Sequence, residues 1–171
     1  NWERWMVQRD FGPDAVSRRG TEAKSNVLDP SNGTAYEGRR THRAAGQDRL
    51  LLFVDDRFLP PGVPTALDLQ VTYKDTGSGS FHVDYSAPAG VASSQAAILT
   101  GSGAWRTVTF RIDDGLWNGA LPSNADFALV VPGPADLEAR FVRLVKRAVA
   151  AVVFLDGFET GGADFWSRQS P

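Results

Sequence analysis

The sequence of 171 residues contains no cysteine and only two histidines, His42 and His82. The absence of cysteine excludes a disulfide scaffold, thiol catalysis and a thiolate zinc site. Two histidines are too few for a multi-histidine metal centre. These absences remove several classes of enzyme before any motif is considered.

The chain also lacks long apolar runs and a strong excess of charge of either sign. No apolar stretch approaches the roughly 20 residues that cross a bilayer, so we expect no membrane span. The formal net charge is −2 and acidic residues are mixed with the arginines, which argues against a nucleic-acid partner. Residues 1–10 lack the basic start and apolar core of a signal peptide. With 42% hydrophobic residues, the composition is that of an ordinary globular protein.

The middle of the chain alternates apolar and polar residues with period two, which is typical of half-buried strands. The pattern is clearest in ALDLQVTYKD (66–75), SFHVDYS (80–86) and WRTVTFRIDD (105–114). Connections rich in Gly, Pro, Ser and Asn separate the strands. This pattern predicts an all-β fold, an antiparallel β-sandwich of jelly-roll type. Further strands are expected near Leu50, at 96–100, from Asp126 and from Glu138.

Two features concern the connections and the end of the chain. TGSG occurs at 76–79 and again at 100–103, and each copy predicts a hairpin turn because glycine supplies positive φ. The composition changes after Arg147. We therefore expect the sandwich over residues 1–147 and a final strand with a short tail over residues 148–171.

Two apolar runs each end in a pair of aspartates, Asp55–Asp56 in LLFVDDRF and Asp113–Asp114 in FRIDDGLW. Neighbouring residues of a strand point to opposite faces, so neither pair alone forms a catalytic dyad. A glycosidase needs two carboxyls roughly 5–10 Å apart, which would require Asp56 and Asp114 to converge. The favoured interpretation is that all four aspartates organise strand ends. They are also candidate ligands for a structural calcium ion, although no D-x-D-x-D-G spacing is present; no other cofactor is expected.

The loop GLWNGALPSNADF (115–127) places Trp117 beside three polar residues, Asn118, Asn124 and Asp126. A loop tryptophan that is exposed calls for a partner on its ring. We predict that Trp117 stacks on a sugar ring while the three polar residues bind its hydroxyls. The alternative is that Trp117 folds back and caps the core.

The basic run GRRTHR (38–43) follows Tyr36. Arg40 and Arg43 are predicted to bind an acidic or terminal group of the ligand, with Tyr36 as a further contact; pairing with the aspartates is the alternative. The nucleophile motif G-x-S-x-G and the zinc motif H-E-x-x-H are both absent, and no catalytic residue is assigned.

Several segments together resemble galactose-binding-like β-sandwich modules appended to secreted bacterial polysaccharide-degrading enzymes. These segments are RLLLFVDDRFLPPGVPTALDLQVTYKDTGSGSFHVDYSA, TGSGAWRTVTFRIDD, NADFAL and LEARFVRLV, within residues 38–147. The resemblance implies a carbohydrate-binding accessory domain, often with a structural ion. It also implies that Asp55, Asp56, Trp105 and Asp126 are architectural. The tail FLDGFETGGADFW resembles an element near the ends of secreted bacterial proteins.

We therefore predict a non-catalytic, extracellular carbohydrate-binding module that is a monomer and binds glycan through loops at one end of the sandwich. Two alternatives stay open. One is a glycan hydrolase or lyase, and the other is a structural or protein-interaction domain.

Overall fold

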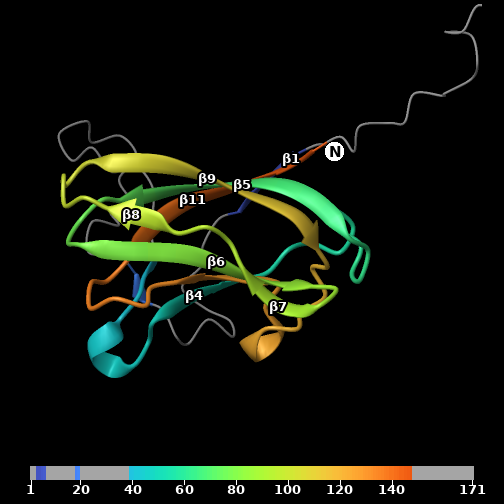
Figure 1. Ribbon diagram of the computed structural model, residues 1–171, viewed down its shortest axis with the longest axis horizontal. Helices are drawn as coiled ribbons and strands as arrows, with labels where there is room; N and C mark the ends of the chain where they lie inside the picture. The colour runs from blue at the N-terminus through green and yellow to red at the C-terminus, as the bar shows by residue number, and fades with distance from the viewer. Residues whose placement is uncertain (1–2, 7–17, 20–38, 148–171) are drawn as a thin grey trace, which may run out of the picture.

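The computed structural model describes residues 3–6, 18–19 and 39–147 (Figure 1). The predictions for Tyr36 and for the segment 148–171 lie outside these residues. No helix in the described part of the chain has the length and apolar character needed to span a membrane. In chain order the elements are β1 (Glu3–Met6), β2 (Arg18–Arg19), β3 (Arg39–Arg40), the 3-10 helix η2 (Arg43–Ala45), β4 (Arg49–Leu52), β5 (Thr65–Lys74), β6 (Gly79–Ala87), β7 (Gly90–Ser93), β8 (Ala97–Leu99), β9 (Trp105–Gly115), the 3-10 helix η3 (Pro122–Asn124), β10 (Phe127–Val130) and β11 (Glu138–Lys146).

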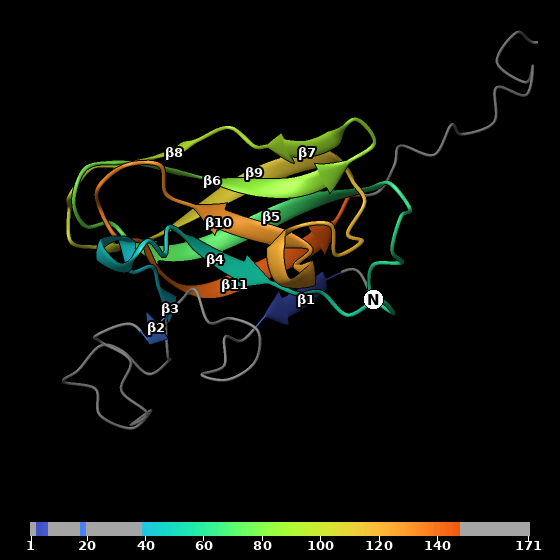
Figure 2. The same cartoon turned by 90° about the horizontal axis from the view of Figure 1, so that it is seen from below.

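The strands form two antiparallel sheets that lie face to face, as Figures 1 and 2 show. The first sheet has the order β2-β3-β11-β5-β9, with β1 paired to β11. The second has the order β4-β10-β6-β7, with β8 paired to β6. From β3 onward the chain changes sheet at every step except from β6 through β8. The predicted all-β antiparallel sandwich is confirmed.

The core lies between the inner faces of the two sheets. On β5 the buried residues alternate with half-exposed polar ones, because successive side chains of a strand point to opposite faces. Phe81 of β6 joins the sheets: its ring lies edge-on to Tyr73 of β5 and Phe110 of β9, with centroid distances of 4.9 and 5.5 Å. Such aromatic pairs add about 0.5–1.5 kcal/mol to the stabilisation from burial.

The two TGSG segments are not hairpin turns, and that prediction is wrong. β5 and β6 belong to different sheets, as do β8 and β9, so each segment crosses from one sheet to the other. The two crossings touch: a Cβ on Gly101, whose φ is +69°, would lie 3.0 Å from the carbonyl oxygen of Gly77. Glycine at 101 therefore allows both the positive φ and the close approach.

Asp75, at the end of β5, holds the second crossing in place. Its side chain is fully buried. Its carboxylate accepts hydrogen bonds from the Thr100 amide at 2.7 Å, the Thr100 hydroxyl at 2.6 Å and the Ser102 hydroxyl at 2.7 Å. It also pairs with the Arg106 guanidinium at 3.2 Å. Hydrogen bonds from Ser102 and Thr100 hold the pKa of Asp75 well below its usual range.

The loop around η3 covers part of the outer face of the second sheet. Leu121 and Ala125, on either side of η3, bury a small apolar cluster with Leu51 of β4 and with Ala128 and Val130 of β10. The segment between β9 and β10 is therefore fixed by packing rather than left free above the sheet.

Candidate functional site

Trp117, the predicted sugar-stacking residue, is only 1% exposed. Its indole stacks at 6.3 Å on the ring of Tyr85 and lies edge-on to Phe127 at 6.1 Å. Its Nε1–H donates a hydrogen bond to the Thr65 carbonyl at 3.3 Å. Gly115 makes room for the ring, since a Cβ there would lie 2.3 Å from Cζ2 of Trp117. The stacking role is wrong because the ring has no free face; Trp117 caps the core, which was the alternative.

Asp126 is architectural as well, as the sequence resemblance implies. Its side chain is buried, and its two carboxylate oxygens accept hydrogen bonds from the amides of Val54 at 2.7 Å and Gly119 at 3.0 Å. Burial raises its pKa, and the two amide hydrogen bonds act in the opposite direction. Since both oxygens bind backbone amides, the structure does not support Asp126 as a ligand contact.

Asn118 and Asn124 are exposed in the same loop. Asn124 has a left-handed backbone with φ +62°, a conformation that asparagine tolerates better than most residues. Their role in ligand binding stays a prediction.

Arg40 and Arg43 lie at the opposite end of the sandwich from this loop. The register between β10 and β4 pairs Phe127 with Leu52 at one end and Val130 with Arg49 at the other. Asn124 precedes the first end, whereas η2, which begins at Arg43, lies beyond the second. Figure 1 shows the cyan η2 and the orange η3 at opposite ends of the second sheet. The prediction that the loop 115–127 forms one binding site together with Arg40 and Arg43 is therefore wrong, because the loop and the two arginines lie at opposite ends of the sandwich.

Both arginines also have partners of their own. The guanidinium of Arg43 donates a hydrogen bond to the Val131 carbonyl, and its backbone amide donates to Asp136 at 2.9 Å. Nε of Arg40 lies 3.8 Å from the Asp136 carboxylate. Arg40 thus pairs with an aspartate, as the alternative for the basic run states, but the partner is Asp136 and not one of the four aspartates of the two pairs.

The first aspartate pair follows β4 in a turn and is not on the strand itself. Asp55 accepts a hydrogen bond from the Arg57 amide at 2.9 Å, and its carbonyl accepts from the amides of Phe58 and Leu59. Asp56 is exposed. These contacts are those of a turn, in agreement with the favoured interpretation.

The second pair ends β9. Asp113 binds the guanidinium of Arg147 and lies 3.4 Å from Nε of Arg111; the hydrogen bond from Arg147 lowers its pKa. Asp114 accepts a hydrogen bond from the Tyr85 hydroxyl at 3.2 Å. Within residues 3–6, 18–19 and 39–147, no three His, Asp or Glu side chains gather in a group that could hold a metal ion. The structure thus gives the calcium site no support.

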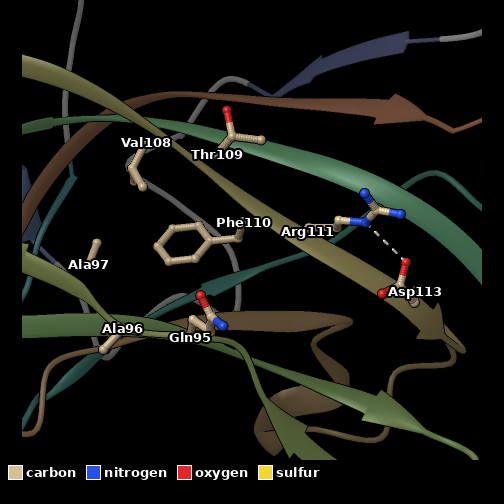
Figure 3. Close-up of a pocket in the computed structure, with 8 residues that line it drawn as sticks. All are labelled: Gln95, Ala96, Ala97, Val108, Thr109, Phe110, Arg111 and Asp113. Carbon is tan, nitrogen blue, oxygen red and sulfur yellow. Dashed lines mark hydrogen bonds and ion pairs between the residues drawn. The ribbon is translucent and has the colours of Figure 1, made fainter.

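An open groove of about 410 Å³ lies along β9, within the usual size range of ligand pockets. In the described part of the sheet order, β9 pairs with β5 alone, so its other edge is free and faces the groove. The lining residues are Gln95, Ala96 and Ala97 from the segment between β7 and β8, and Val108, Thr109, Phe110, Arg111 and Asp113 from β9 (Figure 3).

The groove exists because the edge of the second sheet is interrupted. At the end of β7 the Ser94 amide donates to the Val83 carbonyl at 2.8 Å, and the Ser94 hydroxyl accepts from the Val83 amide at 2.9 Å. The chain then leaves the sheet at Gln95 and pairs with β6 again from Ala97. Gln95 and Ala96 are exposed at this break.

The groove has an apolar floor and polar groups that other residues do not occupy. Phe110 is buried at the floor. Figure 3 shows Gln95 opposite Phe110, and Thr109 and Arg111 on the other side of the β9 ribbon. Among the described residues, the Gln95 amide and the Thr109 hydroxyl have no hydrogen-bond partner, and Arg111 has only Asp113 at 3.4 Å.

The sequence interpretation missed this site. The alternation in WRTVTFRIDD predicted the strand that contains Thr109 and Arg111, but the free edge of β9 depends on the pairing of distant strands. Gln95 lies in the short polar stretch SSQ before a predicted strand. That break in the apolar pattern was the signal available.

Trp105 lies on the outer face of the first sheet and is half-buried rather than part of the core. The Arg140 guanidinium lies 3.3 Å from the centroid of its ring, and Nζ of Lys74 lies 5.5 Å away. Cation–π contacts cover the ring, so Trp105 is not a free platform for sugars.

No protein-family model and no curated protein matches this sequence. Among solved structures, the chain is similar to one named "BiXyn10A CBM1 APO", with a TM-score of 0.43 and 11% identity over 65% of this chain and 73% of the other. It is also similar to the CBM22-1–GH10 modules of the Clostridium thermocellum N-terminal endo-1,4-beta-D-xylanase 10B complexed with xylohexaose. That match has a TM-score of 0.45 and 14% identity over 84% of this chain. It spans 26% of the xylanase chain. These likenesses concern the fold alone.

Proposed function

We propose that this chain is a non-catalytic carbohydrate-binding module and that its site is the groove along β9. The observation that carries the proposal is the set of unoccupied polar groups on the two sides of the free edge of β9, with Gln95 on the groove side and Thr109 and Arg111 on the other. Ligand sites combine an apolar lining with a few placed polar groups. The sequence resemblance implies the same class of function, and an extracellular location is part of the proposal.

The chemistry of the groove suits sugar hydroxyls, which both donate and accept hydrogen bonds. The Gln95 amide and the Thr109 hydroxyl each offer a donor and an acceptor, and Arg111 offers donors alone. The free edge of β9 adds peptide N–H and C=O groups of the kind that every edge strand presents. The side chains of Ala96, which is exposed, and Val108, which is partly exposed, supply an apolar surface for the C–H face of a sugar ring.

The described residues favour binding over catalysis. A general acid of a glycosidase needs a raised pKa. Asp113, the carboxylate that lines the groove, has a lowered pKa because Arg147 binds it. Asp126 has a raised pKa, but its oxygens bind two backbone amides and it lies outside the groove. No observation of these residues supports a hydrolase or a lyase.

The experiment is a binding panel of soluble and insoluble polysaccharides, followed by titration with the best one. Gln95→Ala and Thr109→Val are expected to weaken binding by roughly tenfold each, the effect of one lost hydrogen bond. Thr107→Val is the matched control, because the Thr107 hydroxyl pairs with Thr72 at 2.9 Å and does not line the groove. The proposal would be contradicted if the folded protein bound no glycan. It would also be contradicted if Thr107→Val lost as much affinity as Gln95→Ala and Thr109→Val.

A second candidate function has one observation in its favour. Val91 of β7 and Ile98 of β8 are 62% and 65% exposed, and both strands lie at the edge of the second sheet. Exposed apolar residues on an edge strand favour pairing with another chain. Sedimentation velocity tests this: a dimer that Ile98→Lys dissociates would support an interaction domain, whereas the glycan-binding proposal predicts a monomer.

A further inference from the structure

We propose that the groove selects acidic glycans and that Arg111 binds the carboxylate of a uronic acid unit. This inference rests on the proposed function and assigns its ligand class. It starts from the state of the Arg111 side chain, which is 71% exposed. Its only contact among the described residues is Nε to Asp113 at 3.4 Å. The two terminal nitrogens of its guanidinium therefore keep all their donors.

The acidic neighbours of Arg111 are bound to another residue. Asp68, its cross-strand neighbour on β5, lies 3.2 Å from Nε of Arg147. Asp113 binds a terminal nitrogen of the same guanidinium, which also donates to the Ile112 carbonyl at 2.7 Å. Arg147 thus occupies both carboxylates and is only 18% exposed. Arg111 stays at the surface without a close partner.

The weak contact with Asp113 gives the Arg111 side chain a direction. Figure 3 shows its Nε turned toward Asp113 and its two terminal nitrogens turned away from it. The terminal nitrogens of an arginine form a planar fork that matches a carboxylate with two parallel hydrogen bonds. Asp113 is a positioning residue in this arrangement.

The remaining lining of the groove has no charged side chain: it consists of Gln95, Ala96, Ala97, Val108, Thr109 and Phe110. A sugar unit would lie across the free edge of β9, with Gln95 and Ala96 on one side and with its carboxylate at Arg111 on the other. The net charge of the whole chain is −2, so general attraction to polyanions does not explain such a preference.

The test compares polygalacturonate, alginate and glucuronoxylan with the same polymers after chemical reduction of their carboxyl groups. The wild-type protein is expected to bind at least one acidic form about tenfold or more tightly than its reduced form, the effect of a charge-assisted pair. Arg111→Gln should abolish that difference. Arg111→Lys should restore part of it, because lysine keeps the charge without the fork.

Arg57→Gln is the matched control, since Arg57 is an exposed arginine in the turn after β4 and does not line the groove. It should bind like wild type, and all variants should melt at similar temperatures. Equal affinity for the acidic and reduced polymers would overturn the inference and leave the proposed function standing. If Arg57→Gln lost the preference for acidic polymers as fully as Arg111→Gln, general charge attraction would explain the preference and the inference would be overturned. Binding of dextran sulfate as tight as that of the acidic glycans would have the same meaning. Binding of no polymer would overturn both proposals.

Discussion

Trp117→Ala gives the sharpest test of how the loop between β9 and β10 is built. A buried tryptophan removes about 150–250 Å² from water, which at about 25 cal/mol per Å² gives an upper value near 4–6 kcal/mol. Measured Trp→Ala substitutions in cores cost about 3–5 kcal/mol. The Thr65 carbonyl also loses its donor. We expect the free energy of unfolding to fall by about 4 kcal/mol and the melting temperature by roughly 10–15 °C.

The assay is urea denaturation followed by far-UV circular dichroism, which does not depend on the fluorescence of the missing tryptophan. Trp105→Ala is the control, because Trp105 is half-buried on the outer face of the sheet and its removal leaves no cavity in the core. A Trp117→Ala protein as stable as wild type that no longer binds glycan would refute the reasoning. It would mean that the indole faces the ligand and not the core.

Three further predictions concern single positions. Gly115→Ala should lower the free energy of unfolding by about 1–3 kcal/mol, because its Cβ overlaps the Trp117 ring; an unchanged melting temperature would show that the ring shifts at no cost. The lowered pKa of Asp75 stabilises the folded state above the ordinary aspartate pKa of about 3.9, and this stabilisation is lost as the pH falls through the folded-state value. The urea midpoint of wild type should therefore fall as the pH is lowered from about 4 to about 2, and it should change less for Asp75→Asn. Parallel curves for the two proteins would contradict this. Asp126→Ala should lower the free energy of unfolding by about 1–3 kcal/mol, since the amides of Val54 and Gly119 lose their acceptor in a buried site. A urea midpoint equal to that of wild type would show that water replaces the carboxylate.

The strands could be predicted from the sequence because their signal is local. In β5 and β9 the alternation of side chains follows from the geometry of a single strand, and each strand predicted within residues 39–147 is present. The pairing of strands is not local. The two TGSG segments have the composition of hairpin turns, but the partners of β5 and β9 place each segment between sheets.

The candidate site was harder to predict for the same reason. Trp117 stands in a polar loop, which suggests exposure, but the glycine at 115 and the position of Tyr85 on the other sheet decide its burial. Arg43 and Asn118 were assigned to one site because both lie in loops, and the antiparallel register of β10 separates them. The groove depends on a free strand edge and on a break between β7 and β8, and neither leaves a strong local pattern.

The alternation along β9 also bears on how new specificities could arise. Val108, Phe110 and Ile112 point inward, while Thr109 and Arg111 point outward. Even-numbered positions thus face the core and odd-numbered positions face the surface that we propose for recognition, so a mutational library limited to the odd positions can explore ligands while the core stays constant. A deletion of one residue within the strand would exchange the two sets, and both properties would be lost together.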